Sequence, residues 1–178
     1  MNNKERLRLE LKHKLSVLSE SEHHQKSSQL TKNLEQFLSQ SFLPDICIGG
    51  FVPIQSEPCW FVDKEWSKIA IVHFEKGKEL SFHPISQKEL GGIGITLPSD
   101  YLNEQLLPDV VLVPGLAFTK NGHRLGRGKG CYDRFLSNYQ GVAIGLCFEE
   151  QIVKNVFNEA HDEQMNFIIT EKNIFKGK

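Results

Sequence analysis

The stretch PDVVLVPGLAFTKNGHRLGRGKGCYDRFL, residues 108–136, decides the fold. Its apolar run Val110–Val113 lies between two proline-containing breaks and lacks polar alternation, as is typical of a strand covered on both faces. A second run of this kind is Val142–Leu146. Together they predict an α/β fold with three layers, in which helices cover both faces of a mostly parallel central sheet.

Further short apolar runs predict the remaining strands. These runs are Ile46–Val52, Ile69–Phe74, Leu80–Phe82 and Phe167–Ile169. Leucines at helical spacing predict an amphipathic helix over residues 3–18, capped by Asn3. A capping box of Ser19 and Glu22 predicts a second helix, which Pro44 closes.

Shorter helices are expected over residues 57–66, 131–138 and 149–157. The glycine-rich segment Lys88–Leu107 is typical of a long, irregular connection. We find no internal repeat and no linker that would divide the chain, so residues 1–178 are expected to form a single domain.

Composition places the chain among ordinary globular proteins. It has 178 residues, of which 39% are hydrophobic and 24% charged, and a formal net charge of -1. No apolar run approaches the roughly 18 residues of a membrane span, and the N-terminal stretch is charged where a signal peptide would be apolar. The four cysteines form no CxxC pair. These observations favour a soluble cytoplasmic protein without a disulfide framework or zinc site.

Positive charge is concentrated within the stretch quoted above. Residues 120–134 contain five basic side chains and one acid, whereas the rest of the chain contains 16 basic and 21 acidic residues. Gly126, Gly128 and Gly130 alternate with Arg127 and Lys129 just before the expected helix. Glycines let the backbone approach a ligand, and the interleaved cations attract negative oxygens, so this pattern favours a polyphosphate or another anion.

Two other interpretations of the loop remain open from spacing alone. It matches neither a Walker A loop nor a GxGxxG fingerprint, and a tight solvated turn would also use these glycines. Nucleic-acid contact is disfavoured, because the basic stretch is compact and the rest of the molecule is acidic.

The string NGHRLGRGKGCYD, with the preceding VPGLAF, closely resembles the signature of the 5-formyltetrahydrofolate cyclo-ligases, also called 5,10-methenyltetrahydrofolate synthetases. The resemblance extends to KERLR at the N-terminus, to Glu57 after the first strand and to His161-Asp162 before the last strand. It implies a sheet related to ribose-phosphate isomerase and CoA-transferase architectures. It also implies a monomer that uses ATP and Mg²⁺ to close 5-formyltetrahydrofolate, with or without a polyglutamate tail, into 5,10-methenyltetrahydrofolate.

By motif match, the resemblance also implies the site residues. Arg127 and Lys129 would stabilise the transition state. The ATP site would comprise Lys4, Arg8, Arg124, Leu125, Gly126, Arg127, Gly128, Lys129, Gly130, Cys131 and Tyr132. The folate site would comprise Val52, Glu57, Arg127, Gly128, Lys129, Gly130 and Cys131, and Asp133 and Asp162 would bind Mg²⁺.

Simpler interpretations exist for several of these residues. Lys4 and Arg8 suit a solvated helix end, and Asp133 suits the first turn of a helix. Asp162 would serve as a loop acid, Val52 as the end of a core strand, and Tyr132 as a residue that caps the helix.

Four positions depart from the family pattern. Cys131 replaces an aromatic residue, Trp60 a small hydroxyl residue, His73-Phe74 the pair Pro-Arg, and Asn166 an acid. An alternative function is therefore a folate-binding or regulatory homologue with lost or weak turnover.

Overall fold

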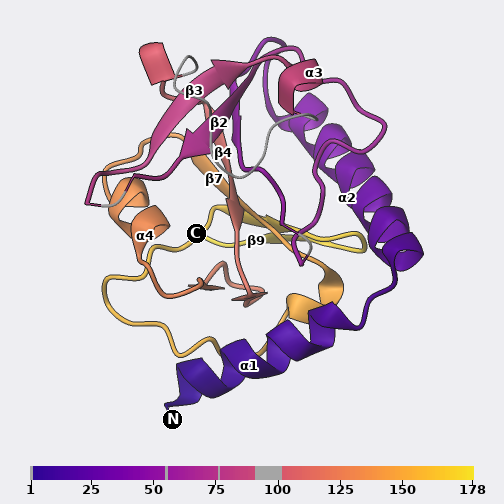
Figure 1. The fold of residues 1–178 in the computed structure, drawn as a ribbon, viewed down its shortest axis with the longest axis vertical. Coiled ribbons are helices and arrows are strands. Elements are labelled where there is room, and N and C mark those ends of the chain that lie inside the picture. Colours follow the sequence, from indigo (N-terminus) through magenta and orange to yellow (C-terminus); the bar gives the residue numbers. More distant parts are fainter. Residues whose placement is uncertain (1, 55, 76, 91–101) are drawn as a thin grey trace.

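The computed structural model describes residues 2–54, 56–75, 77–90 and 102–178 (Figure 1). Its helical elements are α1 (Asn3–Ser16), α2 (Glu20–Ser41), α3 (Gln87–Leu90), α4 (Cys131–Leu136) and the 3-10 turn η2 (Glu149–Gln151). The large sheet contains β1 (Ile48–Gly50), β2 (Ile69–His73), β3 (Ser81–Ile85), β4 (Val110–Pro114), β7 (Val142–Leu146), β8 (Phe167–Ile169) and β9 (Ile174–Lys176). A small hairpin pairs β5 (Ala117–Phe118) with β6 (Arg124–Leu125).

The strand order of the large sheet is β3-β2-β1-β4-β7-β8-β9. Its five inner strands, from β2 to β8, pair in parallel, whereas β3 and β9 pair antiparallel at the two edges. The apolar run Val110–Val113 forms most of β4, at the centre of the sheet, and is buried throughout. The prediction of a mostly parallel sheet is confirmed.

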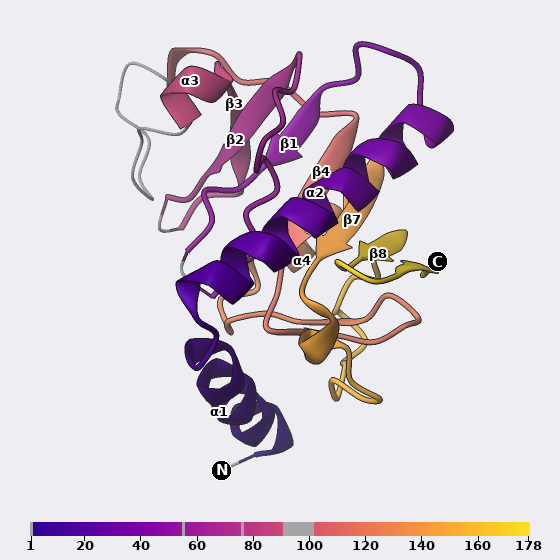
Figure 2. The ribbon, with the colours of Figure 1, turned by 90° about the vertical axis from the view of Figure 1, so that its right-hand side faces the viewer.

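Helices lie on both sides of this sheet (Figure 1). Figure 2 shows α2 running across one face of the central strands. Leu30, Leu34 and Leu38 of α2 are buried in the same core as the strands, and so are Tyr132 and Leu136 of α4. The residues with helical period thus supply the outer layers, and the uninterrupted apolar runs supply the middle one.

Helix α1 lies beyond one end of the sheet (Figure 1). Leu11 is buried and packs with Ala117, Leu125 and Val156, so α1 covers the β5–β6 hairpin. The predicted capping residue was wrong by one position. Asn2, not Asn3, accepts a hydrogen bond from the Glu5 amide and completes a capping box, because the chain before the helix is extended at Asn2.

The helix predicted over residues 57–66 is absent; this segment consists of a turn at residues 60–63 and irregular chain on either side. Asp63 has a φ of +53°, in the left-handed region that a right-handed helix cannot contain. Trp60 is fully buried, and its indole nitrogen donates to the Phe51 carbonyl oxygen at 2.8 Å. Packing of Trp60 in the core therefore decides the conformation of this segment, against the predicted helix.

The helix expected over residues 149–157 is reduced to the short turn η2. The side chain of Gln151 accepts from the Phe148 amide and donates to the Gly115 carbonyl oxygen, which fixes a turn rather than a longer helix. Of the segment Lys88–Leu107, residues 91–101 lie outside the described part. Where the structure is described, no helix is both long and apolar enough to cross a membrane.

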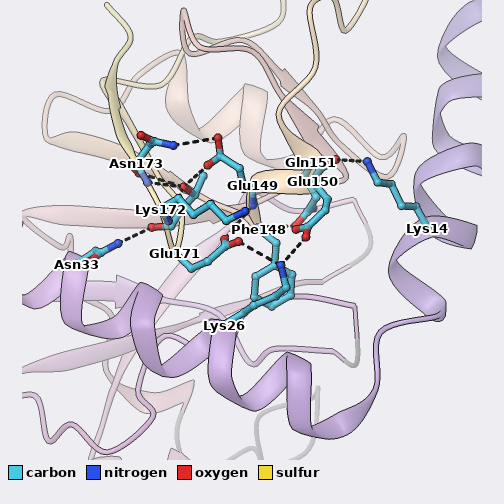
Figure 3. Close-up of polar contacts among 11 residues, drawn as sticks. Lys14, Lys26, Asn33, Phe148, Glu149, Glu150, Gln151, Glu171, Lys172 and Asn173 are labelled. Carbon is cyan, nitrogen blue, oxygen red and sulfur yellow. Dashed lines mark hydrogen bonds and ion pairs between the residues drawn. The ribbon is translucent and has the colours of Figure 1, made fainter.

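A charged cluster joins α2 to η2 and to the turn between β8 and β9 (Figure 3). Lys26 of α2 donates to the carboxylates of Glu150 and of the buried Glu171, the latter at 3.2 Å. Partial burial lowers the pKa of Lys26, but the bonds to Glu150 and Glu171 outweigh it, and the pKa is raised. Partial burial likewise opposes ionisation of Glu150, yet contact with Lys26 brings the pKa of Glu150 below its ordinary value.

We expect Lys26→Met to lower the free energy of unfolding by about 2 kcal/mol at pH 7, because it leaves the buried Glu171 carboxylate without its cationic partner. The loss should be largest between roughly pH 5 and 10. Because the pKa of Glu150 is lowered, its contribution to stability is lost only as the pH falls below the ordinary pKa of a glutamate. Because the pKa of Lys26 is raised, its contribution is lost only as the pH rises above the ordinary pKa of a lysine.

Urea unfolding at several pH values would measure this difference. The exposed Lys32 of the same helix provides the control, and Lys32→Met should change stability by less than about 0.5 kcal/mol. A Lys26→Met effect that did not shrink at pH 3 would contradict the ionic origin of the stabilisation.

Candidate active site

A cavity of about 600 Å³ lies beside the carboxyl ends of β1, β2 and β4. Open α/β sheets bind ligands at this edge, because the loops that follow adjacent parallel strands meet there. Every residue that the sequence placed in the ATP, folate or metal sites lines this cavity. Residues as distant in sequence as Lys4, Glu57, Lys129 and Asp162 are thus brought to one place.

The glycine-rich loop between β6 and α4 forms one wall of the cavity. Gly128 and Gly130 have φ values of +103° and +62°, which L side chains rarely adopt. Glycine is therefore strongly favoured at both positions, since another residue there would be strained. Lys129 lies between them, is exposed, and has no carboxylate within ion-pair distance among the described residues.

Lys4 and Arg8 project from α1 toward the cavity, and neither is merely a solvated helix residue. Lys4 Nζ donates to Asp162 Oδ2 at 2.9 Å and lies 2.9 Å from Glu159 Oε1. Arg8 Nε donates to the Gly126 carbonyl oxygen at 3.0 Å. The first helix is thereby attached both to the glycine-rich loop and to the loop that contains Asp162.

Arg124 and Asp133 form an ion pair beneath the glycine-rich loop. Arg124 is almost fully buried, and its Nη2 donates to Asp133 Oδ2 at 3.0 Å. The guanidinium carbon also lies 5.5 Å from the centre of the Tyr132 ring, in a cation–π arrangement. Arg124 and Tyr132 therefore support the loop from below, and burial raises the pKa of the Tyr132 phenol, which stays neutral.

Glu57 also lines the cavity, is buried, and has three polar partners. Its Oε2 accepts from the Ile54 amide at 3.2 Å, and its Oε1 accepts from Arg127 Nη2 at 3.1 Å. The backbone carbonyl oxygen of Glu57 lies 2.9 Å from Nε2 of His23 on α2. Burial raises the pKa of the Glu57 carboxyl, although the Ile54 amide and Arg127 oppose this effect.

The two carboxylates predicted to bind Mg²⁺ both face the cavity. Asp133 Oδ1 accepts a 3.3 Å hydrogen bond from the Glu163 amide, and Asp162 Oδ1 lies 3.6 Å from His161 Nε2. Among the described residues, no group of three or more metal-ligating side chains gathers. Two carboxylates fit Mg²⁺, which takes one or two of them and completes its shell with phosphate oxygens and water.

Comparison with known proteins assigns the chain to a family. The family model described as the 5-formyltetrahydrofolate cyclo-ligase family matches residues 1–171. This chain belongs to that family. The resemblance carried by the loop and its companion motifs is confirmed.

Individual relatives of the cyclo-ligase family agree. The 5-formyltetrahydrofolate cyclo-ligase of Saccharomyces cerevisiae is 35% identical over 105 residues, which cover 51% of this chain and 50% of the relative. The Escherichia coli 5-formyltetrahydrofolate cyclo-ligase is 30% identical over 104 residues, covering 54% and 57%. The matched part of this chain thus spans about half the length of these curated relatives.

A solved structure of the Aquifex aeolicus 5,10-methenyltetrahydrofolate synthetase has a TM-score of 0.78 to this protein and 28% sequence identity. The superposition covers 97% of this chain and 92% of the Aquifex aeolicus chain. The synthetase from Mycoplasma pneumoniae, at 23% identity and a TM-score of 0.73, shares the fold. The cyclo-ligase fold is therefore established along nearly the whole chain.

The positions that depart from the cyclo-ligase pattern fall into two groups. Cys131, His73 and Phe74 line the cavity, and the Phe74 ring meets the Tyr132 ring edge to face, with centroids 6.0 Å apart. Trp60 lies in the core, and Asn166 accepts from the Ala143 amide at the start of β7. Only the first group can contact a ligand directly.

The cavity is also lined by residues that the sequence did not predict as site residues, among them Asn2, Phe51, Gly115, Glu159 and His161. Glu159 and His161 lie in the charged run EAHDE beside Asp162, a signal that was available. Phe51 and Gly115 look like ordinary ends of core strands, and only the position of the cavity distinguishes them.

Proposed function

We propose that this protein uses ATP to close 5-formyltetrahydrofolate into 5,10-methenyltetrahydrofolate, with release of ADP and phosphate. Membership of the cyclo-ligase family supports this activity. The observation that carries the proposal is that the glycine-rich loop, the two cations of α1, Glu57 and the two aspartates, although far apart in sequence, all line one cavity.

The chemistry explains why ATP is needed. The N5-formyl group is an amide, so its carbon is a weak electrophile and its oxygen a poor leaving group. The formyl oxygen attacks the γ-phosphorus and ADP departs. N10 of the same folate then attacks the activated carbon, the carbon–oxygen bond breaks with departure of phosphate, and the N10 proton is lost. Because both reacting groups belong to one molecule, the protein mainly positions them and stabilises charge.

The loop cations suit the first of these steps. Phosphoryl transfer spreads negative charge over the equatorial oxygens of the moving group, which fixed cations stabilise. Lys129 is available for this task, since it is exposed at the cavity and unpaired among the described residues. Arg8, anchored to the Gly126 carbonyl oxygen, and Lys4 would add positive charge from α1.

Glu57 suits recognition of the pterin. Hydrogen bonds from N–H donors offset the free-energy cost of desolvating a buried carboxylate. The amino group and ring of the pterin supply such donors. Val52 also lines the cavity. We therefore propose that the reduced folate binds against Glu57 and the triphosphate against the glycine-rich loop.

Asp133 and Asp162 would hold Mg²⁺ directly or through water. Bound there, the ion would neutralise charge on the β- and γ-phosphates. Asp133 is kept in place by Arg124, and Asp162 by Lys4 and by the Glu159 amide, which donates at 2.8 Å.

Purified protein mixed with 5-formyltetrahydrofolate and MgATP should generate the absorbance of the methenyl product, and the signal should require ATP. No ATP-dependent change at high protein concentration would refute the activity. If calorimetry then showed folate binding without ADP release, the alternative of a folate-binding or regulatory homologue would be favoured.

We expect Asp133→Asn to raise the Mg²⁺ concentration needed for half-maximal rate about tenfold or more, since removal of a supporting carboxylate typically weakens metal binding by about 10–100-fold. A magnesium titration of the initial rate measures the shift. Glu163→Gln is the control, because only the backbone amide of Glu163 contacts Asp133. An unchanged titration in Asp133→Asn would remove this residue from the metal site.

A further inference from the structure

Arg127 and Glu57 both line the cavity and form an ion pair with each other. Arg127 Nε and Nη2 lie 3.3 and 3.1 Å from Glu57 Oε1, and Nη2 also donates to the Ser56 hydroxyl at 3.0 Å. These atoms form the edge of the guanidinium that a phosphate would engage in a bidentate contact. The Glu57 oxygen that they contact is one that a pterin N–H donor would use.

The contact matters energetically because Glu57 is buried. The Glu57 side chain is 8% exposed, whereas the Arg127 side chain is 38% exposed and borders the cavity. Burial raises the pKa of Glu57, and Arg127 counteracts the effect. A buried carboxylate that loses its cation is left uncompensated, which is far more costly than the loss of a solvent-exposed ion pair.

We propose that the Arg127–Glu57 ion pair couples the nucleotide and folate subsites, so that each ligand strengthens the binding of the other. This inference rests on the proposed function. It takes Arg127, which the resemblance assigns to both ligand sites, as a phosphate ligand and Glu57 as the pterin ligand.

The coupling follows from a binding cycle. ATP alone draws Arg127 away and leaves Glu57 buried without a partner, while folate alone engages Glu57 and displaces Arg127 from it. When both ligands are present, one break of the ion pair serves both, and each residue has a new partner. The free energy of breaking the ion pair therefore opposes binding once for the two ligands together, whereas it opposes each ligand when that ligand binds alone. Linkage requires that each ligand increase the affinity for the other by the same factor.

The pair also acts as a check on the order of events. While Arg127 remains on Glu57, it is withheld from the γ-phosphate. Binding of the pterin at Glu57 releases it toward the phosphate. Full electrostatic stabilisation of phosphoryl transfer is then assembled only when the acceptor folate is present.

Calorimetric titration with Mg²⁺ and a β,γ-imido analogue of ATP, with and without saturating 5-formyltetrahydrofolate, tests the coupling without turnover. We expect the folate to tighten binding of the analogue by about fivefold or more, and the analogue to tighten folate binding by the same factor. Affinities that differ by less than twofold between the two conditions would overturn the inference.

Glu57→Gln separates coupling from simple occupancy. Because the amide is neutral, it holds Arg127 much less strongly than the carboxylate does. The variant should therefore bind the analogue alone several-fold more tightly than the unmodified protein, and folate should no longer improve that affinity. A residue that served only the pterin would leave binding of the analogue alone unchanged. Glu35→Gln, which removes a carboxylate paired with Lys64 outside the cavity, controls for the change in net charge.

A second variant keeps the test decisive if Glu57→Gln fails to fold, as judged by circular dichroism. Arg127→Gln breaks the same pair from the other side and should abolish coupling while folate alone binds at least as tightly as before. Binding of neither ligand to the folded unmodified protein would refute the proposed function itself. Independent binding of both ligands, with methenyl product still formed, would refute the coupling alone.

Discussion

Replacement of Lys129 by alanine is expected to lower turnover at least about 100-fold, the usual loss when one preorganised electrostatic contact to a transition state is removed. Lys129 is held between two glycines with left-handed backbone angles, so its main chain is positioned by the loop itself. Its ammonium group has no competing carboxylate among the described residues, unlike Arg127, which is paired with Glu57. Lys129 is therefore the loop cation that is free to act on the γ-phosphate.

Initial rates at saturating MgATP and folate would measure this effect, because a contact made mainly in the transition state lowers kcat more than it raises KM. Lys120→Ala is a matched control. Lys120 belongs to the same basic stretch, but its ammonium group lies 5.4 Å from the centre of the Phe175 ring and outside the cavity. It should keep turnover within about twofold, and a loss of less than tenfold in Lys129→Ala would exclude Lys129 from catalysis.

The central strands could be predicted from the sequence because their signal is local. Val142–Leu146 and Phe167–Ile169 form strands with the predicted bounds, and Val110–Val113 lacks only Pro114. An uninterrupted apolar run has to be covered on both faces wherever it lies in the molecule. The edge strand β9 was not predicted, because Ile174–Lys176 is largely exposed and contains no uninterrupted apolar run.

Many residues that line the cavity could be named from the sequence, but their contacts with one another could not. The resemblance supplied the residues of the glycine-rich loop together with Lys4, Arg8, Glu57 and the aspartates, and all of them line the cavity. Spacing alone assigned Lys4 and Arg8 to a solvated helix end. Their partners Asp162 and Gly126 lie more than 100 residues away in the chain, and no local pattern encodes such contacts.

Trp60 shows how packing between distant residues overrides a local pattern. The sequence placed it on a helix over residues 57–66, and it is instead one of the largest fully buried side chains. A Cβ atom added to Gly50 of β1 would lie 2.2 Å from the indole ring. The indole therefore fills the space that glycine leaves open over β1, and the two residues are matched to each other.

We accordingly expect Trp60→Ala to lower the free energy of unfolding by about 3–5 kcal/mol, the usual cost of truncating a buried aromatic residue to alanine. The cavity left over Gly50 cannot be refilled from β1, because glycine has no side chain to move into it. Urea unfolding at pH 7 measures the loss. Trp66→Ala is the matched control, since this indole is only half-buried, and it should cost about half as much or less.

Trp60→Ala should also disturb the cavity. The indole nitrogen of Trp60 donates to the carbonyl oxygen of Phe51, and Phe51 and the adjacent Val52 line the cavity. Without this bond, the chain after β1 loses an anchor on the side of Glu57. KM for the folate should therefore rise more than KM for ATP under conditions in which the variant is folded. Equal increases for both substrates, or a stability loss below about 1.5 kcal/mol, well under the range for buried aromatics, would contradict the role assigned to Trp60.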